Sequence, residues 1–173
     1  PGVISSAKLL DQVVPEGALK WDILRPSRAE YKFDDADTIV TFARERGLAV
    51  RGHTLCWYEA LPAWTKAISS AADAERELVT HIEKVVSRYK GIIHSWDVVN
   101  EPVAEKGKLA TDHRPSIWFQ HLGEKYIRIA FEAARRADPN VELVINEYGI
   151  EAATAEDRNK RAAYIGMIRR LKD

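Results

Sequence analysis

Four apolar runs rich in β-branched residues recur along this chain of 173 residues, and a helical pattern separates each run from the next. The runs begin at intervals of roughly 35 to 50 residues, a spacing typical of consecutive βα units on a parallel sheet. Each run ends in polar or aromatic side chains. Because the carboxyl ends of parallel strands meet at one edge, we expect an α/β fold with a site at that edge.

The expected elements follow from apolar periodicity and from punctuation by Gly and Pro. Strands are expected over residues 13–21, 48–55, 92–100 and 141–148, with a short first strand at Val3 and Ile4. Helices are expected over residues 34–46, 73–89 and 117–137, and a last helix follows a Thr154 cap. We see no repeat, low-complexity segment or internal linker, so residues 1–173 are expected to form one, partial, domain.

Composition narrows the class of protein. The chain is 46% hydrophobic and 30% charged, as in a soluble globular protein, and its 26 basic and 26 acidic residues give no net charge. We therefore expect no general attraction to nucleic acid or to anionic membranes. A single cysteine, Cys56, excludes an intrachain disulfide. The first residues do not form a signal peptide, so we expect a mature, truncated or intracellular chain.

The run from Ile92 to Pro102 has the composition of a strand that is buried on both faces. It ends in an amide, a carboxylate and a proline that cannot continue the ladder. Glu101 is thereby placed at the carboxyl end of a strand, where ligand sites of such sheets lie. The alternative interpretation is a solvated loop acid.

The side chains at the strand ends suit a neutral ligand with many hydroxyl groups. Aromatic rings offer faces for sugar C–H surfaces, while amides and acids bind hydroxyls. Glycoside cleavage needs one protonated acid and a second carboxylate, about 5 Å away for retention or roughly 6.5–9.5 Å away for inversion. The candidates are Glu16, Lys20, Trp21, His53, Trp57, Asn100, Glu101, Asn146, Glu147 and Tyr148.

Other chemistries have less support. A metal hydrolase would use His53, His94 and Asp97, but no HExxH or paired-His spacing occurs. Cys56 lies close to His53 in sequence, yet nothing near it would lower a thiol pKa, so we expect a buried structural thiol. Neither GxGxxG nor GxxxxGK[ST] is present, which argues against nucleotide cofactors. We expect no cofactor and no metal site.

Several short motifs together resemble glycoside hydrolase family 10, the endo-1,4-β-xylanases. They are Glu16–Trp21 (EGALKW), Arg51–Trp57 (RGHTLCW), Leu61–Trp64 (LPAW), Arg88–Gly91 (RYKG) and Trp96–Glu101 (WDVVNE). The resemblance runs from about Val13 to the end of the chain in the family's order. It implies a (β/α)8 barrel that hydrolyses β-1,4-xylan with retention through two glutamates, and an extracellular or periplasmic location.

The resemblance also implies roles for individual residues. Glu101 matches the general acid/base, and Asn100 matches the residue that binds the sugar 2-hydroxyl at the cleavage point. The remaining matches are Lys20, His53 and Trp57 on the glycone side, Glu16 at the next sugar out, and Tyr148 as the aromatic after strand five. Gly17 departs from the usual Asn, and the segment before Val13 is shorter than in the family.

A further departure concerns length. The chain ends at Asp173, after what we expect to be the fifth βα unit, whereas a complete barrel takes about 250 residues. Strands six to eight, with the family's nucleophile and aromatic lid, would then lie outside this chain. We expect little activity from the chain alone. We also expect a complementary barrel segment, a partner chain or a swapped dimer to cover the open sheet.

Three alternatives remain open at this stage. Glu147 could form an inverting pair with Glu101, although the matching family position is not the nucleophile. The chain could instead be a xylan-binding or assembly fragment without turnover. It could also belong to a hydrolase of β-linked glucans, since an Asn-Glu pair after strand four is not confined to xylanases.

Overall fold

The computed structural model describes residues 11–105 and 112–172. Its strands are β1 (Gln12–Val13), β2 (Ala49–Cys56), β3 (Ser95–Asn100) and β4 (Glu142–Asn146). Its helices are α1 (Trp21–Leu24), α2 (Asp34–Glu45), the 3₁₀ helix η2 (Ala63–Ala67), α3 (Ala71–Arg88), α4 (Ile117–Leu122), α5 (Lys125–Ala137) and α6 (Ala155–Lys172).

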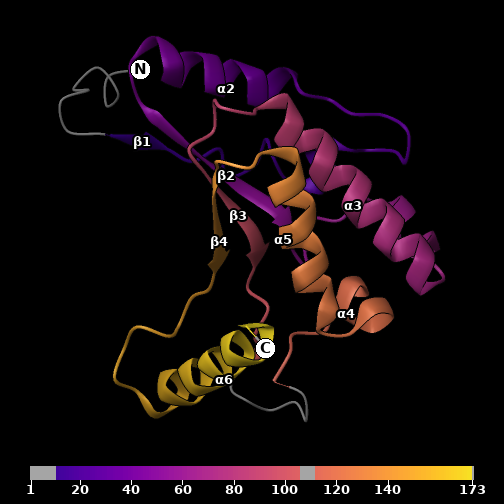
Figure 1. Ribbon diagram of the computed structural model, residues 1–173, viewed down its shortest axis with the longest axis vertical. Helices are drawn as coiled ribbons and strands as arrows, with labels where there is room; N and C mark the ends of the chain where they lie inside the picture. The colour runs from indigo at the N-terminus through magenta and orange to yellow at the C-terminus, as the bar shows by residue number, and fades with distance from the viewer. Residues whose placement is uncertain (1–10, 106–111, 173) are drawn as a thin grey trace.

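The four strands form one sheet in the order β1-β2-β3-β4, and every neighbouring pair is parallel (Figure 1). Along the register, Arg51 lies opposite Ser95, and Ser95 lies opposite Glu142. The predicted succession of βα units on a parallel sheet is therefore confirmed over the described residues. The short strand expected at Val3 and Ile4 falls outside them.

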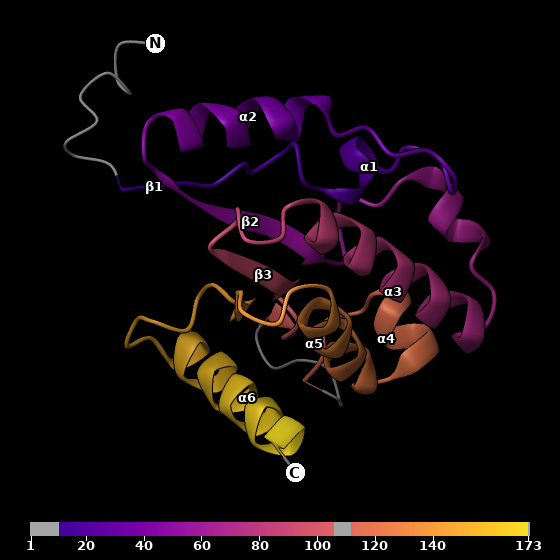
Figure 2. The ribbon, with the colours of Figure 1, turned by 45° about the horizontal axis from the view of Figure 1, so that its top comes forward.

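The helices follow the sheet in chain order, with α2 beside β2, α3 and α5 next to one another, and α6 beyond β4 (Figure 2). A continuous apolar core fills the space between sheet and helices. Trp21, Trp96 and Trp118 are among its largest fully buried side chains. Within the described ranges, no helix combines the length and the apolar character that crossing a membrane requires.

The strand expected over residues 13–21 is wrong for most of its length. β1 ends at Val13, a turn follows over residues 16–19, and α1 begins at Trp21. Pro15 has no N–H to give to a ladder, and the Lys20 N–H donates to the Gly17 carbonyl at 2.9 Å, which closes the turn. Trp21 is 2% exposed, and its indole N–H donates to the Leu55 carbonyl at 2.7 Å, so it belongs to the core.

The helix expected over residues 117–137 is two helices. Gly123 has φ of +61°, a left-handed conformation that ends α4 before α5 begins. The helix expected from Asp73 starts earlier, because the Ser70 hydroxyl accepts the Asp73 N–H at 3.1 Å as an N-cap. The Thr154 cap is confirmed by a 3.1 Å hydrogen bond from the Asp157 N–H.

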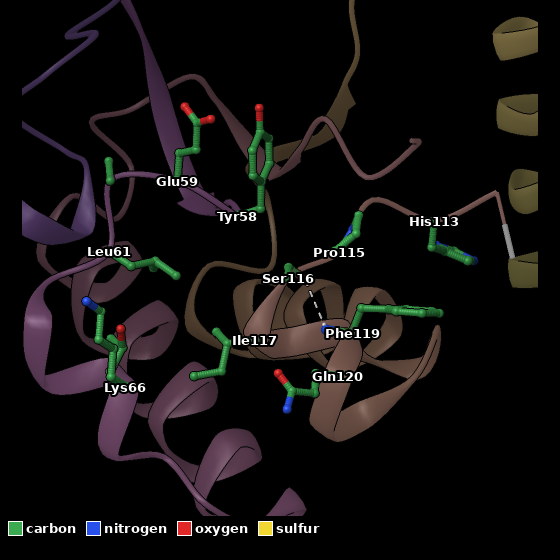
Figure 3. Close-up of a pocket in the computed structure, with 12 residues that line it drawn as sticks. Tyr58, Glu59, Leu61, Lys66, His113, Pro115, Ser116, Ile117, Phe119 and Gln120 are labelled. Carbon is green, nitrogen blue, oxygen red and sulfur yellow. Dashed lines mark hydrogen bonds between the residues drawn. The ribbon is translucent and has the colours of Figure 1, made fainter. Parts of the chain in front are cut away.

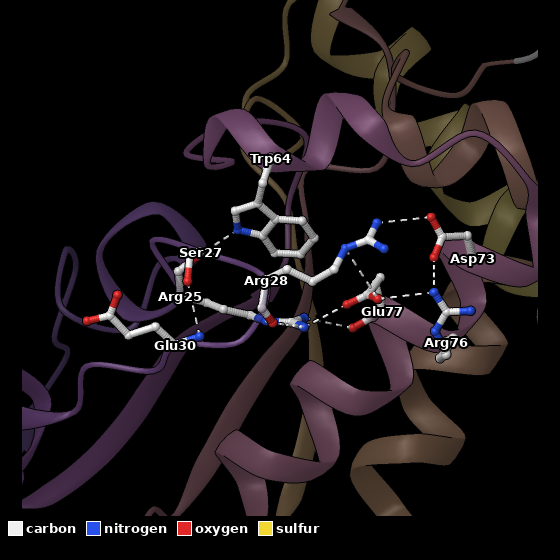
Figure 4. Close-up of polar contacts among 8 residues, drawn as sticks. All are labelled: Arg25, Ser27, Arg28, Glu30, Trp64, Asp73, Arg76 and Glu77. Carbon is white, nitrogen blue, oxygen red and sulfur yellow. Dashed lines mark hydrogen bonds and ion pairs between the residues drawn. The ribbon is translucent and has the colours of Figure 1, made fainter.

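A cluster of charged and aromatic side chains joins the segment around α1 to the start of α3 (Figure 4). Arg25 and Glu77 form a buried ion pair at 2.6 Å. The Trp64 indole N–H donates to the Arg25 carbonyl at 3.0 Å, and Arg28 pairs with Asp73 at 3.0 Å. These contacts fix the chain directly after Lys20 and thereby anchor one side of the site described next.

Candidate active site

Glu101 is the residue immediately after β3, at the carboxyl edge of the sheet. Its N–H donates to the Asn146 carbonyl at 2.8 Å, although β3 itself has ended. Its φ is +52°, in the left-handed region that few residues other than glycine adopt. The side chain is not folded into the core: Glu101 is half-buried, and its Oε2 accepts the Trp57 indole N–H at 3.1 Å.

Trp57 contacts this carboxylate, and Lys20 contacts Trp57. The Lys20 ammonium lies 4.7 Å from the centroid of the Trp57 ring. An ammonium, an indole and the Glu101 carboxylate therefore follow one another at the carboxyl edge of the sheet. Glu16 lies in the same turn as Gly17 and is exposed to solvent. Since no atom lies within 4 Å of the position that a Cβ at Gly17 would take, the turn leaves open space where the resemblance predicts an Asn side chain.

The other predicted polar residues form a hydrogen-bonded layer across three strands. Asn100 is 3% exposed, and its Oδ1 accepts the Asn146 amide at 2.8 Å, which ties the end of β3 to β4. His53 Nδ1 lies 2.9 Å from Asp97 Oδ2, and Arg51 Nε lies 3.1 Å from both Asp97 oxygens. The hydrogen bond of His53 is therefore to Asp97 of β3, not to Glu101.

Asp97 is the electrostatic centre of this layer. Burial acts to raise the pKa of its carboxyl, but hydrogen bonds from His53 and Arg51 outweigh burial and hold that pKa below its ordinary value of 3.8. Asp97 is thus an anion at neutral pH and fully engaged by its two neighbours. It orients His53 and Arg51 and is not a free carboxylate for chemistry.

Tyr148, the predicted aromatic after the strand, is 43% exposed and lies at the rim. Its hydroxyl accepts from Arg114 Nη2 at 3.1 Å and donates to the Glu105 carboxylate. The hydrogen bond to Glu105 and burial both raise the pKa of Tyr148, so the phenol stays neutral. Tyr148 is linked to Glu101 through Arg114, whose Nε donates to the Glu101 carbonyl at 3.0 Å.

Glu147 is fully occupied by structural contacts. Its Oε2 accepts the Val103 N–H at 3.0 Å, and its Oε1 accepts the Tyr148 N–H at 3.1 Å. Lys160 Nζ lies 2.8 Å from the same Oε1, and the Glu147 side chain has no exposed surface. A carboxylate held in this way has no oxygen to offer a water or a sugar, which argues against an inverting pair with Glu101.

The thiol is structural, as expected from the sequence. Cys56 is completely buried, and burial raises the pKa of its thiol well above the usual range. Over residues 11–105 and 112–172, no group of three or more His, Cys, Asp or Glu side chains is arranged to hold a metal ion. His53 and Asp97, two of the metal candidates from the sequence, are instead hydrogen-bonded to each other.

A hollow of about 1110 Å³ lies beside this site (Figure 3). Its wall includes Tyr58 and Leu61 after β2 and Ile117 and Phe119 of α4. Neither Glu101 nor Lys20 lines it. Directly under Glu101 the packing is close, since the cavity between Trp57, Asn100, Arg114 and Trp118 measures only about 10 Å³.

Two residues of the site were not among the candidates chosen from the sequence. Arg114 was one of several charges in a polar segment, and Tyr58 was only one of the side chains after a strand. Both reach Glu101 through the fold: Arg114 Nη1 donates to the Tyr58 hydroxyl at 3.3 Å and Nε to the Glu101 carbonyl. No spacing rule would have connected residues so far apart.

Comparison with known proteins places the whole chain in one family. The model of Glycosyl hydrolase family 10 matches residues 4–173. Endo-1,4-beta-xylanase 2 of Claviceps purpurea is 41% identical over 166 residues, which is 95% of this chain and 50% of that protein. Endo-1,4-beta-xylanase B of Paenibacillus barcinonensis is 40% identical over 172 residues, 96% of this chain and 50% of that protein.

Solved structures agree with these relatives. Xylanase 10B from Thermotoga petrophila, in complex with xylobiose, superimposes with a TM-score of 0.85 at 37% identity, covering 94% of this chain and 47% of that one. The native xylanase 10B from Thermotoga maritima gives the same score and covers 48% of that chain. The described sheet is thus part of a (β/α)8 barrel, and the chain spans about half the length of the curated relatives it matches.

Proposed function

Because the chain belongs to glycosyl hydrolase family 10, we propose that it carries the proton-donating half of a retaining endo-1,4-β-xylanase, with Glu101 as general acid and then general base. The observation that carries this proposal is the position of Glu101: it is half-buried at the end of β3 and hydrogen-bonded to Trp57, whose ring contacts Lys20. Its ligand would be xylan or xylo-oligosaccharides.

In the first step, Glu101 would give its proton to the oxygen of the bond that breaks, while a second carboxylate attacks the sugar carbon. In the second step, the Glu101 carboxylate would take a proton from the water that releases the sugar. Trp57 supports both steps, because its indole N–H fixes one carboxyl oxygen and so directs the other toward the sugar. Asn100, already positioned by Asn146, would donate a hydrogen bond to the sugar 2-hydroxyl or accept one from it.

Sugar binding would spread over both sides of Glu101. On the glycone side, the Trp57 ring offers a face for sugar C–H groups, and Lys20, His53 and Glu16 offer hydrogen bonds. On the leaving-group side, the exposed Tyr148 ring offers a second face. This division agrees with an enzyme that cuts inside a polymer, since sugars on both sides of the cut need a binding surface.

The second carboxylate would come from outside the described residues. Glu147 and Asp97 are both saturated by structural partners. We propose that a further segment or a partner chain completes the barrel and supplies the nucleophile, and that the enzyme acts outside the cell or in the periplasm. A swapped dimer would cover the open sheet but would add no new carboxylate.

The test uses a completed enzyme, defined as this chain fused to the residues that follow the matched region in the Paenibacillus barcinonensis relative. In it, Glu101→Gln should lower xylan hydrolysis about 10²- to 10⁴-fold, the usual contribution of a general acid–base group. Formation of the glycosyl-enzyme from an aryl xylobioside with an acidic phenol should fall much less, because that leaving group departs without a proton.

The matched control is Glu142→Gln, which changes an exposed glutamate at the opposite end of β4. It should leave both rates unchanged. Equal loss on both substrates by Glu101→Gln would contradict the role of proton donor, and an unchanged xylan rate would remove Glu101 from the mechanism altogether.

A further inference from the structure

Arg114 is a buried cation at the mouth of the sheet, outside the set of residues assigned to the reaction above. Only 9% of it is exposed, and its guanidinium reaches three strand ends at once. Nε donates to the Glu101 carbonyl at 3.0 Å, Nη1 to the Tyr58 hydroxyl at 3.3 Å and Nη2 to the Tyr148 hydroxyl at 3.1 Å. These acceptors follow β2, β3 and β4, so one planar group joins all three.

The backbone at Glu101 needs such support. A left-handed φ costs a residue with a side chain about 1–2 kcal/mol, and it persists only where the surroundings fix it. Here the Glu101 N–H is held by the Asn146 carbonyl and its C=O by Arg114 Nε. The Arg114 N–H also donates to the Pro102 carbonyl at 2.8 Å. The peptide groups on both sides of the acid are therefore fixed, largely by Arg114.

The same guanidinium fixes the aromatic rim. Its carbon lies 4.5 Å from the Tyr58 ring centroid and 5.7 Å from that of Tyr148. Tyr148 is 43% exposed, its hydroxyl is held by Arg114, and the Lys160 ammonium lies 3.5 Å from its ring centroid, so the direction of the ring is set. A lysine has one nitrogen and cannot reach three acceptors in a plane, whereas the arginine fork does so without rearrangement.

We propose that Arg114 is a positioning residue for the reaction: it sets the direction in which Glu101 delivers its proton and fixes Tyr148 relative to that carboxyl. Arg114 acts through these neighbours and needs no contact with the sugar. The inference rests on the proposed function of Glu101. It adds that the acid and the leaving-group surface are aligned by one shared side chain, so they lose alignment together.

The test compares Arg114→Lys and Arg114→Gln with the parent in the completed enzyme. A displaced acid should lower kcat/KM on xylan about 100-fold, with the loss mainly in kcat. An aryl xylobioside with an acidic phenol should lose far less, because its departure does not need the proton. Arg136→Lys is the matched control, since Arg136 is an exposed α5 residue paired with Glu83 at 3.0 Å.

A second variant covers the case in which Arg114→Gln fails to fold. Tyr58→Phe with Tyr148→Phe keeps both rings but removes two of the three hydrogen-bond acceptors of the guanidinium, which also pairs with Glu105 at 3.7 Å. It should show the same preference for the aryl substrate, with a smaller loss on xylan. A merely structural arginine would not produce a loss that depends on the leaving group.

The outcomes separate the two proposals. If the parent cleaves xylan and the Arg114 variants lose both substrates in equal proportion, or lose neither, the positioning role is overturned while the function of Glu101 stands. If the folded parent and the Arg136→Lys control cleave no xylan, the proposed function fails, and the role of Arg114 fails with it. Loss confined to xylan supports both.

Discussion

β3 and β4 are neighbouring parallel strands of similar length, yet they differ sharply in burial. All six residues of β3 are buried, whereas none of the five residues of β4 is, and its first residue is exposed. β3 has a strand on each side, while β4 has a described strand on one side only. The acid that we assign to catalysis follows the packed strand, and the other strand contributes chiefly through polar groups at its end.

The helices repeat this difference. α3 and α6 each have 18 residues, but seven residues of α3 are buried and only Lys160 and Met167 of α6. Polar contacts hold α6: Lys160 pairs with Glu147 at 2.8 Å, and Arg170 pairs with Glu124 at 2.7 Å. α3 is thus packed more deeply than α6, which combines these ion pairs with apolar contacts from Met167 and the partly buried Ile168 and Leu171.

The prediction with the largest expected effect tests whether the ion pair of Lys160 with Glu147 holds α6 against the sheet. Lys160→Met should lower the free energy of unfolding by about 3 to 5 kcal/mol, because it leaves the buried Glu147 carboxylate without its cation. Urea unfolding of the chain would measure the loss. Lys125→Met, at an exposed position of α5, is the matched control and should change stability little.

Adding Glu147→Gln to Lys160→Met should recover part of the loss, since the unpaired charge is then removed. A Lys160→Met variant as stable as the parent would contradict the view that this ion pair docks α6, and it would break the contrast between the two regions.

A second change tests packing at the centre. Gly52 lies under Trp96, and a Cβ at Gly52 would come within 2.2 Å of Trp96 Cε3, with both residues buried. Gly52→Ala should therefore cost about 1–3 kcal/mol or more in unfolding free energy, as overpacked cores do. Gly17→Ala, where no atom lies within 4 Å, is the control and should be nearly neutral. Equal stability of the two variants would refute close packing between β2 and β3.

A third measurement uses pH to test burial in the packed region. His81 is completely buried and stacks on Trp21 with centroids 3.8 Å apart. Burial, with help from the charge of Arg25, holds the pKa of His81 well below its usual 6.5. As the pH falls, His81 therefore takes up a proton in the unfolded chain before it does so in the folded chain. The free energy of unfolding should be unaffected by His81 above pH 6.5 and should fall by about 1.4 kcal/mol per pH unit below it.

His81→Phe should remove that slope between pH 6.5 and 5. Asp97 acts in a different window: its pKa is lowered from 3.8, so its contribution is present above 3.8 and is lost only as the pH falls through the lowered value. An unchanged slope in His81→Phe would show that another group titrates there.

The smallest expected effect concerns the surface of α6. Arg170 is 50% exposed and pairs with Glu124, so Arg170→Gln should cost less than about 1 kcal/mol. The cost should shrink further in high salt, because screening weakens exposed pairs. Thermal unfolding at two salt concentrations would measure both; a salt-independent loss of several kcal/mol would mean that this pair, not Lys160, holds the helix.

Apolar periodicity was enough to predict consecutive βα units on a parallel sheet, since strands that alternate with helices leave few other arrangements. It failed where a local choice overrode the pattern. Pro15 and the turn after it ended β1 early, and the positive φ of Gly123 split one expected helix into two. Such breaks depend on the backbone conformation of single residues, which apolar spacing does not report.

The residues of the site likewise divide into those that the sequence could predict and those that it could not. Glu101, Trp57 and Lys20 could be predicted because each follows a strand or its turn, and strand ends meet. The part played by Arg114 could not, because it lies in a loop whose path depends on the finished fold. The saturation of Glu147 was likewise invisible, since Lys160 approaches from a distant helix.

The most direct test of the central claim is the rate of xylan hydrolysis by the isolated chain of 173 residues, with its mass verified. If Glu101 is a proton donor whose partner carboxylate lies beyond the described residues, the rate should be a small fraction of that of the completed enzyme. A rate comparable to the completed enzyme would contradict the claim, because the chain would then contain both carboxylates.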